Sequence, residues 1–349
     1  MRTLERAAIV AIVVLGALAG VAHYTHWAVL PAFAVATLAL AGMAWIVSFG
    51  TEQVGEHLGP AATGLLQATL GNLPELFVVI FALHAGEQAV AQSAIVGSLF
   101  ATALLVLGVV LIVGALRSPD GVMRFHPKVA RDASTLMLVC VFIIVIVGLS
   151  LSSGDAASHH VKVISAIGAG LLLTVYLAWV IPYVRSDRER PLGPFTARVG
   201  LRVALVLLIG AGVGAAFVSD WFVDGLAPAI HRLHISQAFA GLVIVAIASN
   251  AVEHVVGVVL AARRQSDLAI AVVVNSVAQI AAFLFPVLVL ISLTMHTSLT
   301  FSLRPIYIGA LAVSAIVVWQ ITDDGEGHPY EGWALTATYL ILAVITLYE

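Results

Sequence analysis

Two asparagine–glutamate pairs with the spacing N-x-x-E stand inside apolar stretches of the sequence. Asn72 and Glu75 lie in GNLPEL, and Asn250 and Glu253 lie in SNAVEH. If these stretches cross a membrane, a carboxylate in the middle of either one costs about 3 kcal/mol or more, so it normally pairs, binds a ligand or titrates. No Lys or Arg lies near the middle of any apolar stretch. The expected partner is therefore a cation or a proton from outside the chain.

The two pairs are followed by serines at the same offset. Ser98 comes 23 residues after Glu75, and Ser276 comes 23 residues after Glu253. This match predicts two internal repeats, and inverted repeats would bring both carboxylates to the midplane of the membrane. One divalent cation or two protons would neutralise the charge of two carboxylates there.

The neighbouring residues suit an oxygen-liganded cation. Asn72 and Asn250 supply amide oxygens, and Ca²⁺ takes roughly six to eight oxygen ligands. Gly71 and Pro74 weaken helical hydrogen bonding before Glu75, which can free backbone carbonyls as ligands. The sequence has no paired Cys or His cluster, which argues against a dedicated zinc or copper site. Further candidate ligands, or supports for the carboxylates, are Ser98, Asn275, Ser276 and Gln279.

Each candidate also has an ordinary structural interpretation. A membrane glutamate can stay protonated between helices, asparagines can join helices by hydrogen bonds, and serines can let helices pack closely. His254 is either a satisfied buried histidine or a titratable neighbour of Glu253 that assists proton coupling. Glu52 and Asp220 are expected at the cytoplasmic and outer ends of apolar stretches. They are either solvated or admit the cation from each side.

The composition identifies the class of protein that must position these residues. The chain has 349 residues, 61% of them hydrophobic and 10% charged, and its mean hydropathy is +1.07. Soluble domains carry about 25% charged residues. We therefore expect an all-α polytopic membrane protein. The single cysteine, Cys140, excludes an intramolecular disulfide.

Eleven apolar stretches approach or exceed the length needed to cross a bilayer. Residues 1–22 also have the layout of a signal peptide, although a first transmembrane helix is favoured. The expected spans are residues 7–23, 27–49, 62–84, 93–116, 133–152, 162–183, 200–219, 237–262, 268–292, 305–321 and 333–347.

The distribution of basic residues predicts the topology. With a cytoplasmic N-terminus and eleven alternating spans, thirteen of the 16 Lys and Arg residues fall on the cytoplasmic side and three outside. The C-terminus is then outside. Five spans on each side of a basic loop predict inverted repeats. The expected organisation is an N-terminal transmembrane helix (1–26), a first five-helix repeat (27–184), a cytoplasmic linker (185–199) and a second five-helix repeat (200–349).

At these residues the sequence resembles the cation/proton exchanger (CAX) family of the cation/calcium exchanger superfamily. GLLQATLGNLPEL and VGSLFATALLVLG resemble its first repeat, and SNAVEHVVGVVLAARRQSDLAIAV and NSVAQIAAFLFPVLVL resemble its second. The resemblance implies Ca²⁺/H⁺ exchange, with the essential glutamates at Glu75 and Glu253 and the repeat-two histidine at His254. The chain differs from the family pattern at Ser249 and Asn275, where glycine is usual. Ala101 and Thr102 replace a Ser-Asn pair.

The predicted function is a secondary antiporter that exports Ca²⁺ in exchange for H⁺ at a midplane site of two glutamates. Exchange of Na⁺ for Ca²⁺, or transport of Na⁺, K⁺ or Mn²⁺, stays open, as does a homo-oligomer. An enzyme is disfavoured because the sequence has no H-E-x-x-H and no G-x-S-x-G. A passive channel is disfavoured because the chain carries its own inverted pair. We expect Ca²⁺ to be the transported ion and expect no cofactor. The expected partner is the lipid bilayer, with no nucleic acid. The expected location is a prokaryotic plasma membrane.

Overall fold

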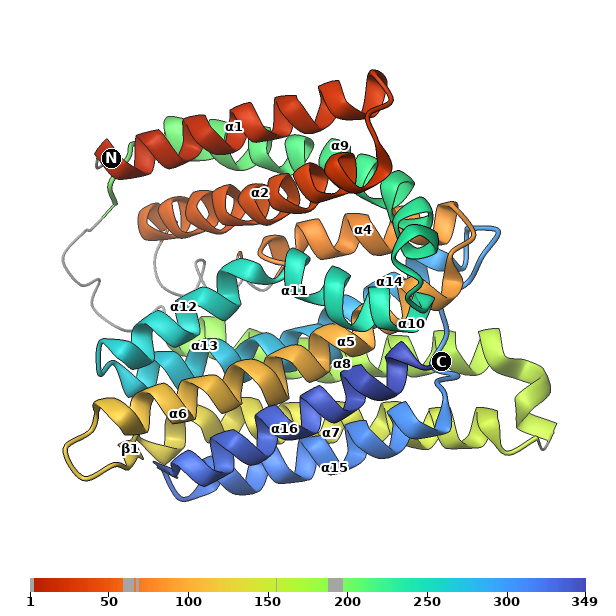
Figure 1. The fold of residues 1–349 in the computed structure, drawn as a ribbon. Helices are drawn as coiled ribbons and strands as arrows, with labels where there is room; N and C mark the ends of the chain where they lie inside the picture. The colour runs from red at the N-terminus through yellow and green to blue at the C-terminus, as the bar shows by residue number, and fades with distance from the viewer. Residues whose placement is uncertain (1–2, 59–65, 67–68, 155, 188–196) are drawn as a thin grey trace. The chain divides into compact units, whose positions relative to one another are not determined.

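The structure, a computed structural model, describes residues 3–58, 66, 69–154, 156–187 and 197–349 as a helical protein with two short strands (Figure 1). The π-helical segments are labelled η1, η3 and η4, and the 3₁₀ segment is η2. The elements are α1 (Thr3–Tyr24), α2 (Val29–Leu58), α4 (Leu73–His84), α5 (Gln88–Phe100), η1 (Ala101–Val106), α6 (Leu107–Arg117), β1 (Met123–Arg124), α7 (Pro127–Ser152), η2 (Ala156–His160), α8 (Val161–Asp187), α9 (Leu201–Leu233), α10 (Gln237–Phe239), η3 (Ala240–Val245), α11 (Ala246–Ser249), α12 (Ala251–Ala262), α13 (Ser266–Gln279), η4 (Ile280–Leu284), α14 (Phe285–Ser292), α15 (Pro305–Asp323), β2 (Glu326–Gly327) and α16 (Pro329–Leu347).

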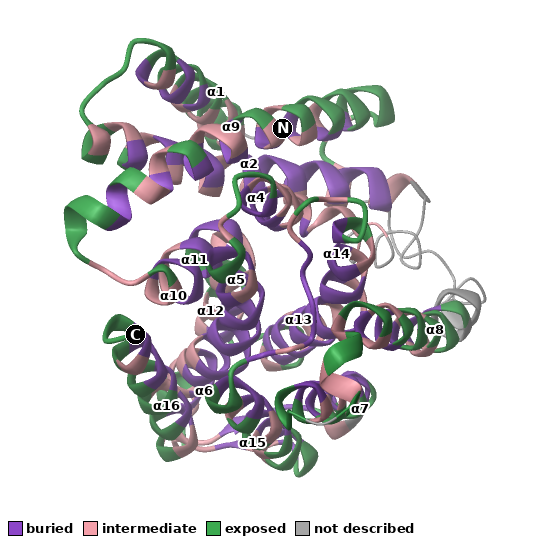
Figure 2. Ribbon diagram, turned by 90° about the vertical axis from the view of Figure 1, so that its right-hand side faces the viewer, coloured by how far each residue is buried: buried purple, intermediate pink, exposed green. Residues whose placement is uncertain are grey.

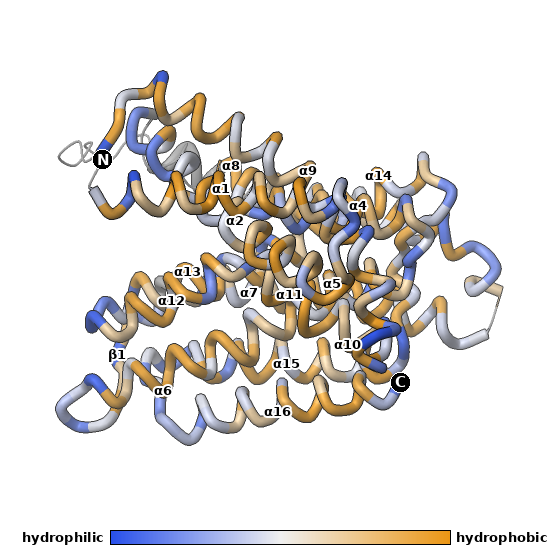
Figure 3. The backbone as a smooth tube through the Cα atoms, turned by 45° about the horizontal axis from the view of Figure 1, so that its top comes forward, coloured by the Kyte–Doolittle hydropathy of each residue, from blue (hydrophilic) through white to orange (hydrophobic). Residues whose placement is uncertain are grey.

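Apolar helices confirm the predicted class of integral membrane protein. Among the described residues, nine helices are long and apolar enough to cross a membrane, and a bent pair makes up to ten. Figure 3 shows the hydrophobic residues running along these helices. The predicted span 62–84 is described only in part: residues 62–65 and 67–68 lie outside the described residues, and Leu73–His84 is a shorter apolar helix. The count of eleven spans therefore stays a prediction.

The chain forms two compact units that do not follow the order of the sequence. The first comprises Met1–Ala85, Leu177–Ile235 and Ala248–Val252, and the second comprises Gly86–Tyr176, Ser236–Ile247 and Glu253–Glu349. The predicted boundaries at residues 26, 184 and 199 divide the chain into internal repeats, whereas the two compact units are defined by contacts. The predicted division into repeats therefore stays a prediction. Most of the predicted linker, residues 188–196, lies outside the described residues.

In the first unit, α1, α2, α4 and α9 pack together through small residues. A Cβ added at Gly50 of α2 would lie 3.1 Å from the backbone of Leu208 on α9, so the two helices approach closely there. Small residues allow such close packing in membranes, where dispersion contacts hold helices together. Both α2 and α9 are longer than the predicted spans 27–49 and 200–219.

In the second unit, α5 is buried along most of its length (Figure 2). It packs on η3 through two glycines that face the opposite backbone. A Cβ at Gly97 would lie 2.5 Å from the carbonyl oxygen of Leu242, and a Cβ at Gly241 would lie 2.7 Å from the carbonyl oxygen of Val90. This contact holds α5 and the adjoining η1, which carry Ser98 and Thr102.

Candidate functional site

Both glutamates lie in the first turn of a helix rather than in the middle of one. Glu75 is in the first turn of α4, and Glu253 is in the first turn of α12. Pro74 favours a helix start at this place because its missing N–H is not needed in the first turn. The exposed N–H groups of a helix N-terminus favour an anion by about 0.3–1 kcal/mol. Both carboxylates therefore stand where the backbone supports their charged form.

The start of α12 is a sharp bend in the chain. The helical pair Gln237–Ser249 and Ala251–Ala262 is bent by 63°, and Asn250 stands at the break. The sequence predicted one span over residues 237–262, and the structure divides that span at the N-x-x-E motif. The break interrupts the helical hydrogen bonds and exposes backbone groups beside the polar residues.

In the first unit, the Glu75 carboxylate is fully buried and is held by an asparagine from the other motif. Asn250 Nδ2 donates to Glu75 Oε2 at 3.3 Å and also lies 3.3 Å from Ser249 Oγ. The sequence predicted that the two N-x-x-E motifs would meet, and this bond joins one residue of each.

Asn72 is a buried amide at the N-cap of α4 that does not cap the helix. Its side chain is 2% exposed, and neither its nitrogen nor its oxygen has a hydrogen-bond partner among the described residues. Asparagine at this position normally accepts from an N–H of the first turn. An unsatisfied buried amide costs about 1–3 kcal/mol, so this side chain is suited to an added ligand.

In the second unit, Ser276 Oγ donates to Glu253 Oε2. This contact joins the serine and the glutamate whose spacing first indicated a repeat. His254 Nε2 lies 3.4 Å from Thr102 Oγ1, and the Thr102 side chain is buried in η1. Sequence reasoning treated Thr102 only as a departure from a family pattern. Its position four residues after Ser98 could have indicated that the two share a helix face.

Two other candidates lie beside π-helical segments of the second unit. Ser98 is fully buried on α5 shortly before η1, and Gln279 is half-buried at the end of α13 immediately before η4. The last residues of η1 and η4 are the same number of residues apart in the chain as Glu75 and Glu253. The first residues of α4 and α12, and their last residues, are also that number of residues apart. π-Helical turns are rare and are frequent at functional sites.

The two acidic residues expected at span ends lie inside longer helices. Asp220 is in the interior of α9, which continues to Leu233, and Glu52 lies before the last turn of α2. The helices continue past these residues because a helix satisfies its own backbone hydrogen bonds, so one carboxylate does not end it. The predicted ends of the membrane spans stay predictions. Whether Glu52 and Asp220 admit the cation stays a prediction.

Comparisons with known proteins identify relatives over nearly the whole chain. The family described as "Sodium/calcium exchanger protein" matches residues 28–182 and 203–348. The "Ca(2+)/H(+) antiporter" of Synechocystis sp. is 30% identical over 345 residues, which cover 93% of this chain and 92% of the relative. The "Ca(2+)/H(+) antiporter ChaA" of Bacillus subtilis is 28% identical to this chain. The match covers 91% of this chain and 92% of the relative.

Solved structures share the fold. The structure of native YfkE has a TM-score of 0.83 and is 26% identical in sequence. The match covers 98% of this chain and 100% of the YfkE chain. The "H+/Ca2+ Exchanger CAX" has a TM-score of 0.78 at 16% identity, covering 99% of this chain and 93% of that one, and supports the fold alone.

Proposed function

Because the chain belongs to the sodium/calcium exchanger protein family, we propose that it is a secondary antiporter that exports Ca²⁺ from the cytoplasm in exchange for H⁺. The resemblance to the cation/proton exchangers predicted from the sequence is confirmed. Relatives from Synechocystis sp. and Bacillus subtilis carry the name Ca²⁺/H⁺ antiporter. The cytoplasmic N-terminus and the prokaryotic plasma membrane stay predictions.

One observation supports the proposal most: two carboxylates stand at equivalent helix starts, each held by a neutral polar side chain. Glu75 accepts from Asn250, and Glu253 accepts from Ser276. Neutral donors leave the negative charge of a carboxylate in place. Such a carboxylate can be neutralised by a proton or a metal cation, which are the two cargoes of a Ca²⁺/H⁺ exchanger.

We infer that Glu75 and Glu253 act as one site in the transport cycle. The support comes from chain spacing and from the repeat. Asn250, which binds Glu75, is three residues before Glu253, and the same family matches both halves of the chain. Asn72 and Asn250 would supply amide oxygens to Ca²⁺, together with backbone carbonyls at the helix breaks.

Coupling follows from the cost of an empty charged site. Two ionised carboxylates without a cation are too costly to pass between inward-facing and outward-facing states. Two protons or one Ca²⁺ remove most of that cost. Each change of state therefore carries either protons or Ca²⁺, which is exchange by alternating access.

The first test is uptake of radioactive Ca²⁺ into inside-out vesicles with an acidic interior. Because proton exit drives the exchange, we expect Ca²⁺ accumulation that needs the pH gradient and stops when a K⁺/H⁺ ionophore dissipates it. Vesicles without the protein are the control. Gradient-driven uptake of Na⁺, K⁺ or Mn²⁺ but not Ca²⁺, with insertion verified, would overturn the Ca²⁺ assignment. Ca²⁺ flux independent of the gradient would indicate a channel.

Replacing Ser276 by alanine is expected to weaken Ca²⁺ uptake without abolishing it. The change removes a hydrogen bond to the Glu253 carboxylate, and a bond to a charged group contributes about 1.5 kcal/mol or more. The Ca²⁺ concentration that gives half-maximal uptake should rise about tenfold. Ser153→Ala is the matched control, because Ser153 is exposed and bonds only to the nearby Ser150 carbonyl in the described structure. Equal curves for the two variants would contradict the role of Ser276.

A further inference from the structure

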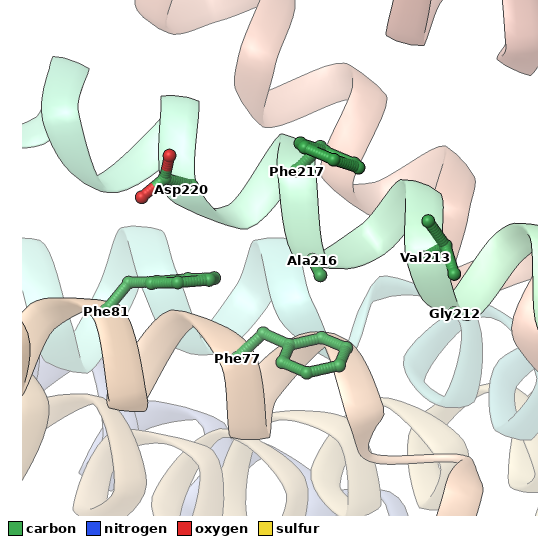
Figure 4. A pocket seen from close by; sticks show the side chains of 7 residues that line it. All are labelled: Phe77, Phe81, Gly212, Val213, Ala216, Phe217 and Asp220. Carbon is green, nitrogen blue, oxygen red and sulfur yellow. The ribbon is translucent and has the colours of Figure 1, made fainter.

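A cavity of about 440 Å³ lies in the first unit, between α4 and α9. Figure 4 shows the rings of Phe77 and Phe81 extending from α4, with Asp220 of α9 at one end of the space and Val213 at the other. The volume falls within the range of about 300–1,000 Å³ that is usual for small-molecule pockets. It is large enough for an organic ligand.

The cavity lies behind α4, away from the face that presents Glu75. Successive residues of an α-helix are about 100° apart, so Phe77 stands about 200° around the helix from Glu75, and Phe81 about 240°. Glu75 meets Asn250 on its own face. The cavity is therefore distinct from the site proposed for Ca²⁺ and H⁺.

Asp220 gives this cavity a negative charge. Its side chain makes no hydrogen bond or ion pair with any residue in the described part of the chain, whereas Asp224, one turn further on, lies 3.9 Å from His23. Among the described residues, His23 and His84 are near enough to interact with this charge, but neither forms an ion pair with Asp220. The charge indicates that the ligand of the cavity is a cation.

The lining favours an organic cation over a metal ion. Of the described residues around the cavity, Asp220 alone has a side-chain oxygen, and the others are apolar. Ca²⁺ takes roughly six to eight oxygens and Mg²⁺ six, which this lining does not provide. The faces of phenylalanine rings attract ammonium groups, and Phe77 and Phe81 present two rings whose centroids are 6.4 Å apart.

We propose that this cavity binds a lipophilic organic ammonium, with the ammonium group at Asp220 and the apolar body against Phe77 and Phe81. The ligand reaches the cavity from the bilayer, because Val213 and Phe217 at its rim are each more than half exposed. The ligand would lie between α9 and the helix that carries Glu75.

The test is equilibrium dialysis of 2-(1-naphthyl)ethylammonium against the purified full chain in phosphatidylcholine nanodiscs. We expect saturable binding that is at least tenfold tighter than binding of 2-(1-naphthyl)ethanol, which has the same ring system without the charge. Asp220→Asn should weaken amine binding at least tenfold. Asp132→Asn is the matched control, because Asp132 is an exposed aspartate of α7 in the other unit, and it should bind as the native chain does. No Ca²⁺ flux is needed, so the outcome is independent of the transport experiments.

A cavity-filling variant keeps the test decisive if Asp220→Asn does not fold. Ala216→Phe places a ring in the cavity and should abolish saturable binding of the amine while Asp220 is retained. Equal binding by the native chain and Ala216→Phe, or equal binding of the amine and the alcohol, would overturn the proposal. Competition by phosphatidylethanolamine added to the nanodiscs would support the proposal, because this lipid is itself a lipophilic organic ammonium.

Discussion

Replacing Glu75 or Glu253 by glutamine is expected to abolish Ca²⁺ uptake driven by an acidic vesicle interior. Glutamine has nearly the shape of a protonated glutamate but cannot release a proton or offer a charged oxygen to Ca²⁺. Removing one partner of a buried, hydrogen-bonded charge pair costs about 2–5 kcal/mol, and about 3 kcal/mol corresponds to roughly a 100-fold lower rate. The measurement is the initial rate of radioactive Ca²⁺ uptake in inside-out vesicles with matched amounts of inserted protein.

The glutamine variants also separate the two interpretations of a membrane glutamate. If Glu75 were permanently protonated and served only to join helices, glutamine would replace it and uptake would continue. Glu326→Gln is the matched control, because Glu326 is a partly exposed residue of β2 that pairs with Arg124. Retained uptake in Glu75→Gln or in Glu253→Gln would show that the affected glutamate is structural. A loss in Glu326→Gln as well would indicate a general effect of removing charge.

Replacing Gly97 by valine is expected to destabilise the second unit strongly. A Cβ at this position would lie 2.5 Å from the carbonyl oxygen of Leu242 and 2.8 Å from its carbonyl carbon. These are backbone atoms, so no side-chain rotation relieves the clash, and α5 must move away from η3. Overpacking of this kind typically costs about 1–3 kcal/mol, and more where backbone must shift. The thermal unfolding midpoint in detergent should fall by several degrees, or the protein should aggregate.

Gly170→Val is the matched control for this substitution. Gly170 is also a helical glycine of the second unit, on α8, and a Cβ there would meet nothing within 4 Å. Both changes carry the same intrinsic cost of a β-branched residue in a helix. The difference between their unfolding midpoints therefore measures the contact between α5 and η3. Equal midpoints would contradict the close approach of the two elements.

The class of protein and the family were readable from the sequence because both depend on local patterns. Apolar runs long enough for a bilayer predict membrane helices wherever they occur, and N-x-x-E followed by serine is a short motif with a fixed spacing. The sequence also indicated the partner of one glutamate. Ser276 was singled out by its distance from Glu253, and in the structure its hydroxyl binds that carboxylate.

The full lengths of the helices were not readable from the apolar runs where polar residues interrupt them. Glu52 and Asp220 were placed at span ends, but α2 and α9 continue past them. Hydropathy counts each side chain alone, whereas a helix is sustained by backbone bonds that a single carboxylate does not break. The same limit applies to η1 and η4, because no residue type marks a π-helical turn.

What the sequence by itself determined about this protein is the set of chemical groups: two membrane carboxylates, two amides and matching serines at repeated intervals. What only the tertiary structure decided is which groups meet. The bond from Asn250 to Glu75, the contact of Thr102 with His254 and the cavity beside Asp220 each join residues far apart in the chain. The physical reason is that these contacts depend on how closely helices approach and at which rotation. Both are decided by the packing of small residues such as Gly50 and Gly97 against distant backbone.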